Sequence, residues 1–338
     1  MTVKKITLSL VVIIVLFMSI TLWWLNKDMQ RELNSPLAFT GSEIIQLRPG
    51  QSLKSLSREI TDKGWMKHPY YLEFEARKQN VASRLKAGEY TITPGTTPLQ
   101  LLDIFVEGKV KQYSMTIPEG WTLTQILDAI AANPELQQTL TTSRPEQVMS
   151  LAGFAGHFAE GRIFPDTYLF PAGTSDIEFI QRAVKTQKKV LQEEWARREE
   201  GLPYKSAYEA LIMASIIEKE TGRAEERQHI AGVFVRRLRL GMKLQTDPTV
   251  IYAMAERFDG NIRRKDLSID SPYNTYRYKG LPPTPIASPG RDAIHAALHP
   301  LPGKTLYFVA RGDGSHYFSE TLEEHNKAVR KYQLNKKK

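Results

Sequence analysis

The chain has 338 residues, of which 41% are hydrophobic and 25% are charged, a balance typical of globular proteins and not of long disordered ones. Its formal net charge of +9 suggests an anionic partner, but no nucleic-acid-binding motif accompanies the charge, so we expect no nucleic-acid partner. The absence of cysteine excludes disulfides, thiol nucleophiles and thiolate metal sites, and the length predicts two domains or one domain with an attached module.

The N-terminus predicts a membrane anchor. Residues 1–5 are short and basic, and residues 6–25, ITLSLVVIIVLFMSITLWWL, carry no charge over a length that spans a bilayer. Trp23 and Trp24 lie where interfacial aromatic residues are enriched. A cleavable signal peptide is the alternative, but the apolar run is long and no small-x-small cleavage site follows it. We therefore expect an uncleaved anchor. Because lysines precede the run, we expect its N-terminus in the cytoplasm and the remainder of the chain outside it.

A weak internal repeat follows a polar stalk at residues 26–42. The repeat units are IIQLRPGQSLKSLSREI from Ile44, YTITPGTTPLQLLDIF from Tyr90 and SMTIPEGWTLTQILDAI from Ser114. Each combines strand-like alternation, a Pro/Gly turn, a Ser or Thr suited to cap a helix, and apolar residues at helical spacing. The pattern predicts strand–turn–helix units, which we divide between a small α+β module at residues 43–113 and a larger α+β domain at residues 114–338.

From about Thr122 the pattern is mainly helical. Ser143 begins a capping-box signature, and Ser175–Asp176 begins a long charged amphipathic helix. The stretch SPYNTYRYKGLPPTPIASPG is rich in Pro, Gly and aromatic residues and predicts an ordered irregular loop. The elements expected in this part are helices at 175–200, 206–221, 224–240 and 321–334, the loop at 271–290 and a strand–turn–strand hairpin at 306–319.

Glu218 is the candidate for acid–base chemistry. Leu211, Ala214 and Glu218 recur at helical spacing, so the carboxyl group extends the apolar stripe of a predicted helix. Poor hydration disfavours the charged form of a carboxyl and raises its pKa, as a general acid near neutral pH requires. A buried salt bridge, for instance with an arginine of the following helix, is the structural alternative. Glu220 falls beside the more polar side of the helix, where exposure or a pair with Arg223 is sufficient to explain it.

Four long motifs carry a resemblance to a known family. They are EGRIFPDTYLF from Glu160, LIMASIIEKETGRAEERQHIAGVFVRRLRLGMKLQTDPTVIY from Leu211, SPYNTYRYKGLPPTPIASPG from Ser271 and LYFVARGDGSHYFSETLEEHN from Leu306. Together they resemble the endolytic murein transglycosylases, the MltG or YceG-like family, over nearly the whole chain after the anchor. The family's catalytic glutamate falls on Glu218. One departure is Arg236, where we expect Asn in many relatives, and it lies outside the glutamate motif.

The resemblance implies an inner-membrane protein with a periplasmic catalytic domain, a LysM-like module near the membrane, and cleavage inside nascent peptidoglycan strands. In the implied mechanism, Glu218 protonates the glycosidic oxygen between N-acetylmuramic acid and N-acetylglucosamine. It then accepts the proton of the muramyl C6 hydroxyl as that oxygen attacks C1. The product is a 1,6-anhydro sugar and no water is consumed. A hydrolase would ordinarily need a second carboxylate; none is obvious in the Glu218 motif, and Asp247 and Asp166 are the candidates for one elsewhere in the sequence.

Several other residues are candidates for contacts with sugar. Asp247 precedes a proline and an apolar run, which favours a helix N-cap, and Asp166 lies in a turn, where it caps or orients a neighbour. The remaining candidates offer amides, hydroxyls and stacking faces, which either line a groove or hold an irregular loop in shape. They are Gln245, Tyr273, Asn274 and Tyr276.

No metal or cofactor is expected. His295 and His299 are four residues apart, but a proline follows and the HExxH pattern is absent, so helix-end histidines are the better interpretation. The GDG at residues 312–314 predicts a tight hairpin turn, since a calcium loop needs further spaced carboxylates.

Two other functions remain open on the residues alone. A non-catalytic wall-binding scaffold would recruit peptidoglycan synthases through its module and anchor, although it would not require a carboxyl group on an apolar helix face. A muramidase would differ from the lyase only because water attacks in place of the C6 hydroxyl. The partners that we expect are peptidoglycan glycan strands, inner-membrane lipid and, as candidates, peptidoglycan synthases.

Overall fold

The computed structural model describes residues 2–142, 144–156 and 158–334. The chain divides into two compact units, Met1–Tyr113 with Leu169–Ala172 and Ser114–Tyr168 with Gly173–Lys338. Helices predominate, and the strands of the described part form three two-stranded sheets, β1–β2, β3–β4 and β5–β6. The α+β class predicted from the sequence is confirmed, with small sheets.

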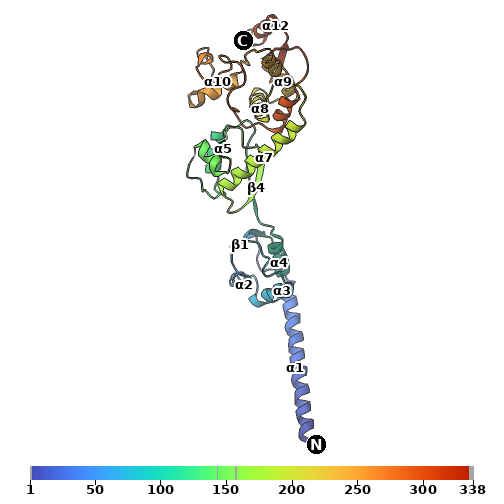
Figure 1. The fold of residues 1–338 in the computed structure, drawn as a ribbon. Helices are drawn as coiled ribbons and strands as arrows, with labels where there is room; N and C mark the ends of the chain where they lie inside the picture. The colour runs from blue at the N-terminus through green and yellow to red at the C-terminus, as the bar shows by residue number, and fades with distance from the viewer. Residues whose placement is uncertain (1, 143, 157, 335–338) are drawn as a thin grey trace. The chain divides into compact units, whose positions relative to one another are not determined.

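The first helix, α1 (Thr2–Leu33), continues well beyond the predicted anchor (Figure 1). It is long and apolar enough to cross a membrane, and its apolar side chains from Leu8 to Leu25 are exposed, as a lipid-facing helix requires. Its last turns differ, because Met29 and Leu33 are buried in the core of the first unit. Leu37 is buried in the same core, so three residues of the segment 26–42, predicted as a polar stalk, pack into the unit.

The first unit contains two of the predicted strand–turn–helix repeats. β1 (Glu43–Leu47) pairs antiparallel with β2 (Gly88–Ile92), and the helices are α2 (Leu53–Asp62), α3 (Pro69–Lys78) and α4 (Pro98–Glu107). Ser52 and Thr97 each accept a hydrogen bond from the backbone amide three residues on, which confirms both predicted N-caps. Glu32 of α1 accepts hydrogen bonds from the backbone amides of Lys67 and His68, and so fixes the end of α1 to this unit.

The third repeat leads into a helical segment. β3 (Gln112–Thr116) and β4 (Thr167–Pro171) form the second sheet. Thr122 caps α5 (Leu123–Ala131) and Ser175 caps α7 (Asp176–Ala196), each within a capping box. The start of α6 (Pro145–Leu151) differs from the prediction, since its N-cap is Arg144, which makes no side-chain capping bond. Ser143, on which the capping box was predicted, lies outside the described residues.

The central helix of the second unit is α8 (Ala207–Glu220). It packs against α7, α9 (Ala224–Arg239), α10 (Asp247–Met254) and α11 (Arg291–Leu298). Residues 210–217, ALIMASII, are all buried because these neighbours cover the helix on every side. Gly241 adopts the left-handed backbone (φ +61°) just after α9, the usual end of a helix, so the predicted bounds of α8 and α9 hold to within a residue.

The irregular loop predicted at residues 271–290 is confirmed, and it lies against α8. The backbone amide of Ile286 donates to the buried hydroxyl of Ser215 at 3.0 Å. Ser288 exchanges two backbone hydrogen bonds of 2.8 Å with Gly120 and Trp121, which precede α5. The loop therefore brings the start of α11 and the turn before α5 to the C-terminal end of α8.

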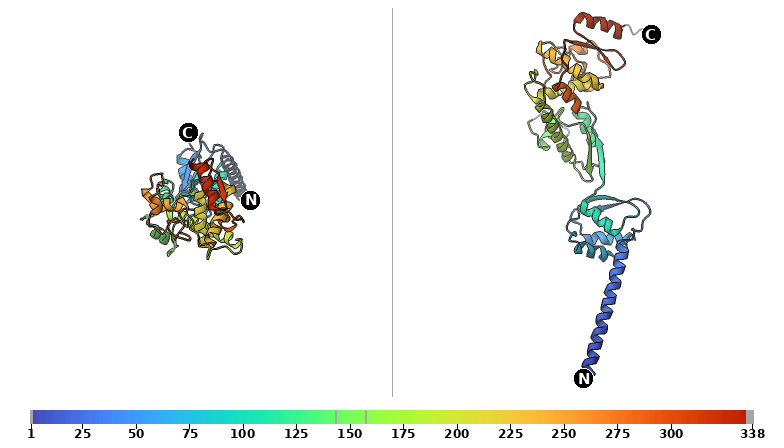
Figure 2. Two further views of the ribbon diagram at one scale, coloured as in Figure 1. Left: turned by 90° about the horizontal axis from the view of Figure 1, so that it is seen from above. Right: turned by 90° about the vertical axis from the view of Figure 1, so that its right-hand side faces the viewer.

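The C-terminal elements are a hairpin and a helix. β5 (Tyr307–Ala310) pairs antiparallel with β6 (His316–Ser319), as predicted, and α12 (Leu322–Val329) packs on both strands (Figure 2). The chain continues from α12 into a π-helical turn, η3 (Arg330–Leu334). Two short 3₁₀ segments, η1 (Ala255–Arg257) and η2 (Asp266–Ser268), lie between α10 and the irregular loop.

Candidate active site

Glu218 lies near the C-terminal end of α8, where three other segments converge on it. Its side chain is only 6% exposed. The backbone amide of Gly290, at the start of α11, donates to Oε2 at 3.0 Å, and Nη2 of Arg227 on α9 lies 3.5 Å from Oε1. On the side of the turn before α5, a Cβ added to Gly120 would lie 3.8 Å from the Glu218 side chain. The carboxyl group is thus enclosed without being cut off from polar partners.

Arg227 holds three carboxylates together. Its Nη2 lies 3.5 Å from Glu218 and 3.5 Å from Glu119, and its Nη1 lies 3.2 Å from Asp292. The Arg227 side chain is 11% exposed, whereas those of Glu119 and Asp292 are 47% and 73% exposed. When Glu218 is protonated, two carboxylates and one guanidinium remain, with a net charge of −1. A positive charge that develops on a sugar ring beside this cluster would be stabilised.

The environment of Glu218 favours its protonated form. Burial is the largest cause that raises its pKa above the ordinary value, and the negative charges of Glu119 and Asp292 raise it further. The Gly290 amide and Arg227 lower it, without reversing the shift. The poorly hydrated carboxyl predicted from the helical spacing is therefore supported. The structural alternative, an ion pair with an arginine of the following helix, is present as well, and the two coexist at this site.

Glu220 differs from its sequence interpretation, which was wrong. It does not pair with Arg223, whose guanidinium lies 3.5 Å from Glu225 instead. The carboxyl of Glu220 accepts a hydrogen bond from the hydroxyl of Thr246, and burial raises its pKa to about 7. The residue keeps some exposure, but its carboxyl end is desolvated because α8 is covered on this side too.

Three predicted site residues gather around Glu220. Gln245, Asp247 and Tyr276 line a cavity of about 490 Å³ whose described lining includes Glu220 and not Glu218. The Tyr276 hydroxyl donates to Asp247 at 2.6 Å. Thr246 is the N-cap of α10 and Asp247 its first residue, so the predicted N-cap was one position off, and the Asp247 carboxylate is left free to bind Tyr276.

The remaining predicted site residues have partners within the fold. Asn274 is fully buried, and its side chain donates to the backbone oxygens of Leu267 and Ile269, at η2, and accepts from the backbone amide of Tyr276. It holds the loop in shape and does not line a groove. The Tyr273 hydroxyl lies 2.8 Å from that of Thr284, and its ring packs on the apolar core. Asp166 is exposed and accepts a hydrogen bond from the backbone amide that follows it, which agrees with a turn residue.

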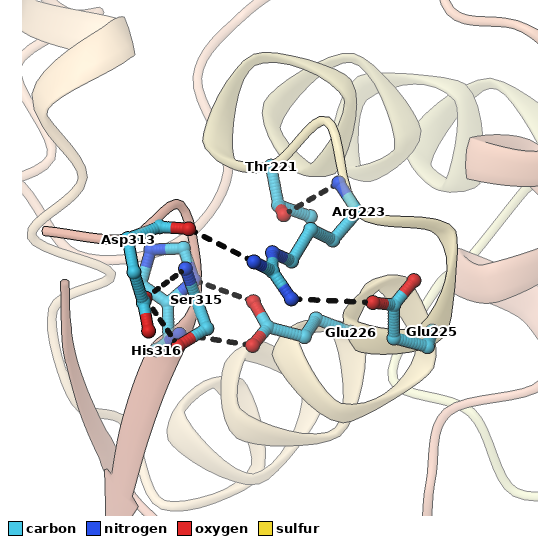
Figure 3. A network of polar contacts seen from close by, with 7 residues as sticks. All are labelled: Thr221, Arg223, Glu225, Glu226, Asp313, Ser315 and His316. Carbon is cyan, nitrogen blue, oxygen red and sulfur yellow. Dashed lines mark hydrogen bonds and ion pairs between the residues drawn. The ribbon is translucent and has the colours of Figure 1, made fainter. Parts of the chain in front are cut away.

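A polar network fixes the turn after α8 to the β5–β6 hairpin (Figure 3). Arg223 donates to the backbone oxygen of Asp313 at 2.8 Å. Glu226 accepts the backbone amide of His316 at 2.9 Å and lies 2.7 Å from the Nδ1 of the same residue. Because His316 lines the Glu220 cavity, the network holds one wall of that cavity in place against α8 and α9.

Glu160 is a further buried carboxyl, to which no role was assigned from the sequence. It accepts hydrogen bonds from the backbone amides of Leu123 at 2.9 Å and Gly161 at 3.3 Å and from the Tyr252 hydroxyl at 3.0 Å. Burial raises its pKa to about 7. These bonds tie the start of α5 to α10, so its role is architectural.

The histidines have protein partners. Nδ1 of His295 lies 3.0 Å from Glu194, and His299 contacts the backbone oxygens of His295 in α11 and of Arg197 just after α7, in agreement with helix-end histidines. Within the ranges that the structure describes, one group, Asp28, Glu32 and His68, brings three potential metal ligands within 4.8 Å of one another. Glu32 and His68 are already bonded to each other there, at 2.6 Å, so this group serves to fix α1.

Comparison with known proteins shows the family of this chain. Residues 45–331 match a model of the YceG-like family. The chain belongs to the YceG-like family. The match includes Glu218, Arg227, Glu119 and Asp292, and it begins after α1. It therefore confirms the resemblance that the four motifs had indicated.

Relatives of this YceG-like chain carry a common name. The endolytic murein transglycosylase of Bacillus subtilis (strain 168) is 35% identical over 280 residues, which cover 78% of this chain and 76% of that protein. The protein of the same name from Streptococcus pneumoniae serotype 2 (strain D39) is 29% identical over 320 residues, covering 84% of this chain and 57% of the relative. A crystal structure of a yceG-like protein from Listeria monocytogenes superposes with a TM-score of 0.56 at 35% identity, covering 85% of this chain and 98% of that one.

Sequence reasoning did not identify Glu119, Arg227 or Asp292, and of the three Arg227 alone left a usable signal. Glu119 lies in a Pro-Glu-Gly turn. The proline and the glycine are explained by the turn, and the glutamate between them was left without a role. Arg227 lies in a charged helical segment that resembles any solvated face. A charged residue next to the apolar positions of α9 was the available signal, since Arg227 must be partly buried there.

Proposed function

We propose that this YceG-like chain is a membrane-anchored endolytic lytic transglycosylase. Its substrate is the glycan of nascent peptidoglycan, cleaved between N-acetylmuramic acid and N-acetylglucosamine so that elongation is limited. The observation that carries the proposal is a nearly buried carboxyl, Glu218, whose surroundings favour the proton and which lies beside a net negative cluster. The names of the relatives support the substrate class.

In the proposed reaction Glu218 acts first as an acid. Its proton passes to the glycosidic oxygen as the bond from that oxygen to C1 of the muramyl residue breaks, and the N-acetylglucosamine hydroxyl leaves. The positive charge on the muramyl ring is stabilised by the remaining carboxylates of the cluster, Glu119 and Asp292. Glu218 is then a carboxylate, which Arg227 and the Gly290 amide stabilise from 3.5 Å and 3.0 Å.

In the second half Glu218 acts as a base. The muramyl C6 oxygen attacks C1 of the same residue, and Glu218 takes the hydroxyl proton. The bond formed between O6 and C1 replaces the bond broken, the carboxyl regains its proton, and water takes no part. One carboxyl therefore completes the cycle. Its surroundings suit both roles, because desolvation favours the protonated form that acts as the acid, and the contact with Arg227 stabilises the carboxylate that acts as the base.

A muramidase is the second candidate, and Glu119 is the observation that favours it. Glu119 and Glu218 approach the same Arg227 nitrogen, so a second carboxylate lies close to the first despite their distance in sequence. Hydrolytic glycosidases use such a pair, with the second carboxylate as nucleophile or as the base that activates water. The two reactions leave different ends, a 1,6-anhydro sugar or a reducing sugar.

The remaining architecture is proposed as follows. The apolar part of α1 spans the inner membrane with the N-terminus in the cytoplasm and both units in the periplasm, supported by its exposed apolar surface and by Lys4 and Lys5. Residues 43–113 form a LysM-like module that binds glycan, and residues 114–338 form the catalytic domain. Lipid and peptidoglycan synthases are the further proposed partners. A non-catalytic scaffold would not require a nearly buried carboxyl such as that of Glu218.

Turnover of purified glycan tests the assignment. The full-length Glu218→Gln protein should lose at least about 100-fold in turnover, since the amide cannot donate and regain a proton. Its unfolding midpoint should stay close to that of the wild type, because the amide replaces a poorly hydrated acid. Glu225→Gln is the matched control, because Glu225 is 69% exposed and pairs only with Arg223 in the described contacts. A Glu218→Gln protein with full activity would remove Glu218 from the mechanism.

A further inference from the structure

The cavity beside Glu220 is not used by the proposed reaction at Glu218. Its walls come from the ends of α8 and α9, the segment before α10, the irregular loop, the β5–β6 hairpin and α12. It encloses about 490 Å³, which is in the range of small-molecule sites. Every lining residue belongs to the second unit, so the cavity is a feature of one compact body.

The carboxyl of Glu220 makes this cavity a polar one. Its hydrogen-bond partner among the described side chains is Thr246, which leaves acceptor or donor capacity for a ligand. Arg237 also lines the cavity, but its guanidinium donates to the backbone oxygens of Leu244 and Leu306 at 2.7 Å each. It is used as a brace and makes no ion pair with Glu220 in the described contacts. Burial raises the pKa of Glu220 to about 7, so its carboxyl is partly protonated near neutral pH and can donate as well as accept.

A strained residue stands at the edge of the cavity. Gln245 has φ +52°, a left-handed conformation that is uncommon outside glycine and costs free energy. The backbone amides of Gln245 and Thr246 donate to the backbone oxygen and the hydroxyl of Thr275, which hold the strained turn in place. Such strain tends to occur at ligand sites, and here it places a side-chain amide on the lining.

The lining selects the class of ligand. Tyr276, Tyr307 and Phe308 supply aromatic surface, and Glu220, Asp247 and Gln245 supply hydrogen-bonding groups. The Arg237 cation offsets the carboxylate charge in the lining, so no strong net charge selects an ion, and the aromatic surface with amide and hydroxyl partners suits an uncharged ring that carries hydroxyl and amide groups. An N-acetylated sugar has this chemistry.

We propose that the Glu220 cavity binds an N-acetylhexosamine of the glycan strand, as a subsite separate from the Glu218 cluster. Glu220 and Gln245 bond the polar groups of the sugar, and Tyr276 packs on its ring. The identity of the ligand as glycan rests on the proposed function, whereas the existence of the site rests on the cavity. Glu218 and Glu220 stand two residues apart on α8 and point to different sides of the helix, so a sugar held here would bind the strand at a point separate from the acid.

Hydrogen–deuterium exchange with mass spectrometry tests the subsite without requiring turnover. The protein is full-length Glu218→Gln, which should not cleave, and the probe is the β-1,4-linked tetramer of N-acetylglucosamine. We expect slower exchange in the peptides that cover residues 244–247, 273–278 and 306–310. Binding to residues 43–113 would appear in other peptides and so remains separable.

Two added variants and one control decide the outcome. Tyr276→Ala should raise the tetramer concentration for half-maximal protection of these peptides at least about 10-fold. The reason is that the variant loses both the aromatic contact with the sugar ring and the area that this contact buries. Gln245→Gly relieves the left-handed backbone, so it should fold at least as well as its parent and still require about 3- to 10-fold more tetramer. Tyr278→Ala, in the same loop but outside the cavity lining, should match its parent.

Protection that is absent from these peptides, or unchanged in both variants, would overturn the subsite. That result would leave the role of Glu218 untouched, because the assay measures no cleavage. Conversely, protection of these peptides, together with a wild-type protein that cleaves no glycan, would preserve the sugar site and reject the proposed enzyme.

Discussion

Replacing Gly290 by alanine tests whether the charge of Glu119 acts on Glu218. A Cβ on Gly290 would lie 1.7 Å from Oε1 and 2.3 Å from Cδ of Glu119, so the Glu119 carboxylate must leave its position. The backbone itself does not oppose the change, because Gly290 has φ −73° and ψ 172°, which alanine also adopts. Gly290→Ala therefore displaces one charge of the cluster while the amide bonded to Glu218 remains.

The cost to stability follows from where Glu119 can go. Its side chain is 47% exposed and can rotate into solvent, losing an ion pair with Arg227 that is worth about 0.5 kcal/mol at such exposure. Alanine is a poorer N-cap for α11 than glycine by roughly another 0.5 kcal/mol. The free energy of unfolding, measured with urea, should therefore fall by about 1 kcal/mol. A loss above about 3 kcal/mol would show that Glu119 is locked in place and that the clash is absorbed by the core.

The effect on activity has a definite sign. The charge of Glu119 raises the pKa of Glu218, so its displacement lowers that pKa, and the acid form is lost at lower pH. The alkaline limb of the profile of kcat/KM against pH should move to lower pH in Gly290→Ala and in Glu119→Gln, which removes the charge without a clash. Asp292→Asn, at a 73% exposed carboxylate, should move it less. An alkaline limb that stays in place in both Gly290→Ala and Glu119→Gln would refute the electrostatic role of Glu119.

Other consequences can be measured separately. Gly232→Ala places a Cβ 2.4 Å from the backbone oxygen of Leu301, so the free energy of unfolding in urea should fall by about 1–2 kcal/mol, even with the gain in helix propensity. Gly222→Ala, where no atom lies within 4 Å of the new Cβ, should change that free energy by less than about 0.5 kcal/mol. Because the folded-state pKa of Glu160 is raised to about 7, the native state binds more protons between about pH 4.5 and 7, and the free energy of unfolding should fall as the pH rises through this range, less steeply in Glu160→Gln. A reporter fused after Lys338 should be active in the periplasm with the protein in the membrane fraction, and a soluble form that starts near residue 26 would contradict an uncleaved anchor.

Local signals in the sequence were sufficient for most of the elements. Ser52, Thr97, Thr122 and Ser175 each cap a helix because a hydroxyl can bond the amide three residues on, a relation contained within a few residues. The end of α1 was not predictable in this way. Met29 and Leu33 lie within the segment predicted as a stalk, and only the tertiary core of the first unit shows that they are buried in protein.

The site shows a similar division. The helical spacing of the apolar residues identified Glu218, because its burial follows from the apolar stripe of its own helix. It failed for Glu220, since a polar side of an isolated helix becomes interior when α10 and the hairpin cover it. Glu119 and Asp292 could not be assigned at all, because their approach to Arg227 depends on the loop that joins two distant parts of the chain.

The most direct test of the central claim is the origin of the oxygen at the new glycan end. The full-length protein is incubated with purified peptidoglycan in ¹⁸O-labelled water, and the products are analysed by mass spectrometry. If Glu218 drives attack by the muramyl C6 hydroxyl, the fragments end in 1,6-anhydro-N-acetylmuramic acid without label, and Glu218→Gln yields almost none of them. Reducing ends that carry ¹⁸O would show that water attacked, and would contradict the lyase in favour of a hydrolase that uses Glu119 as its second carboxylate.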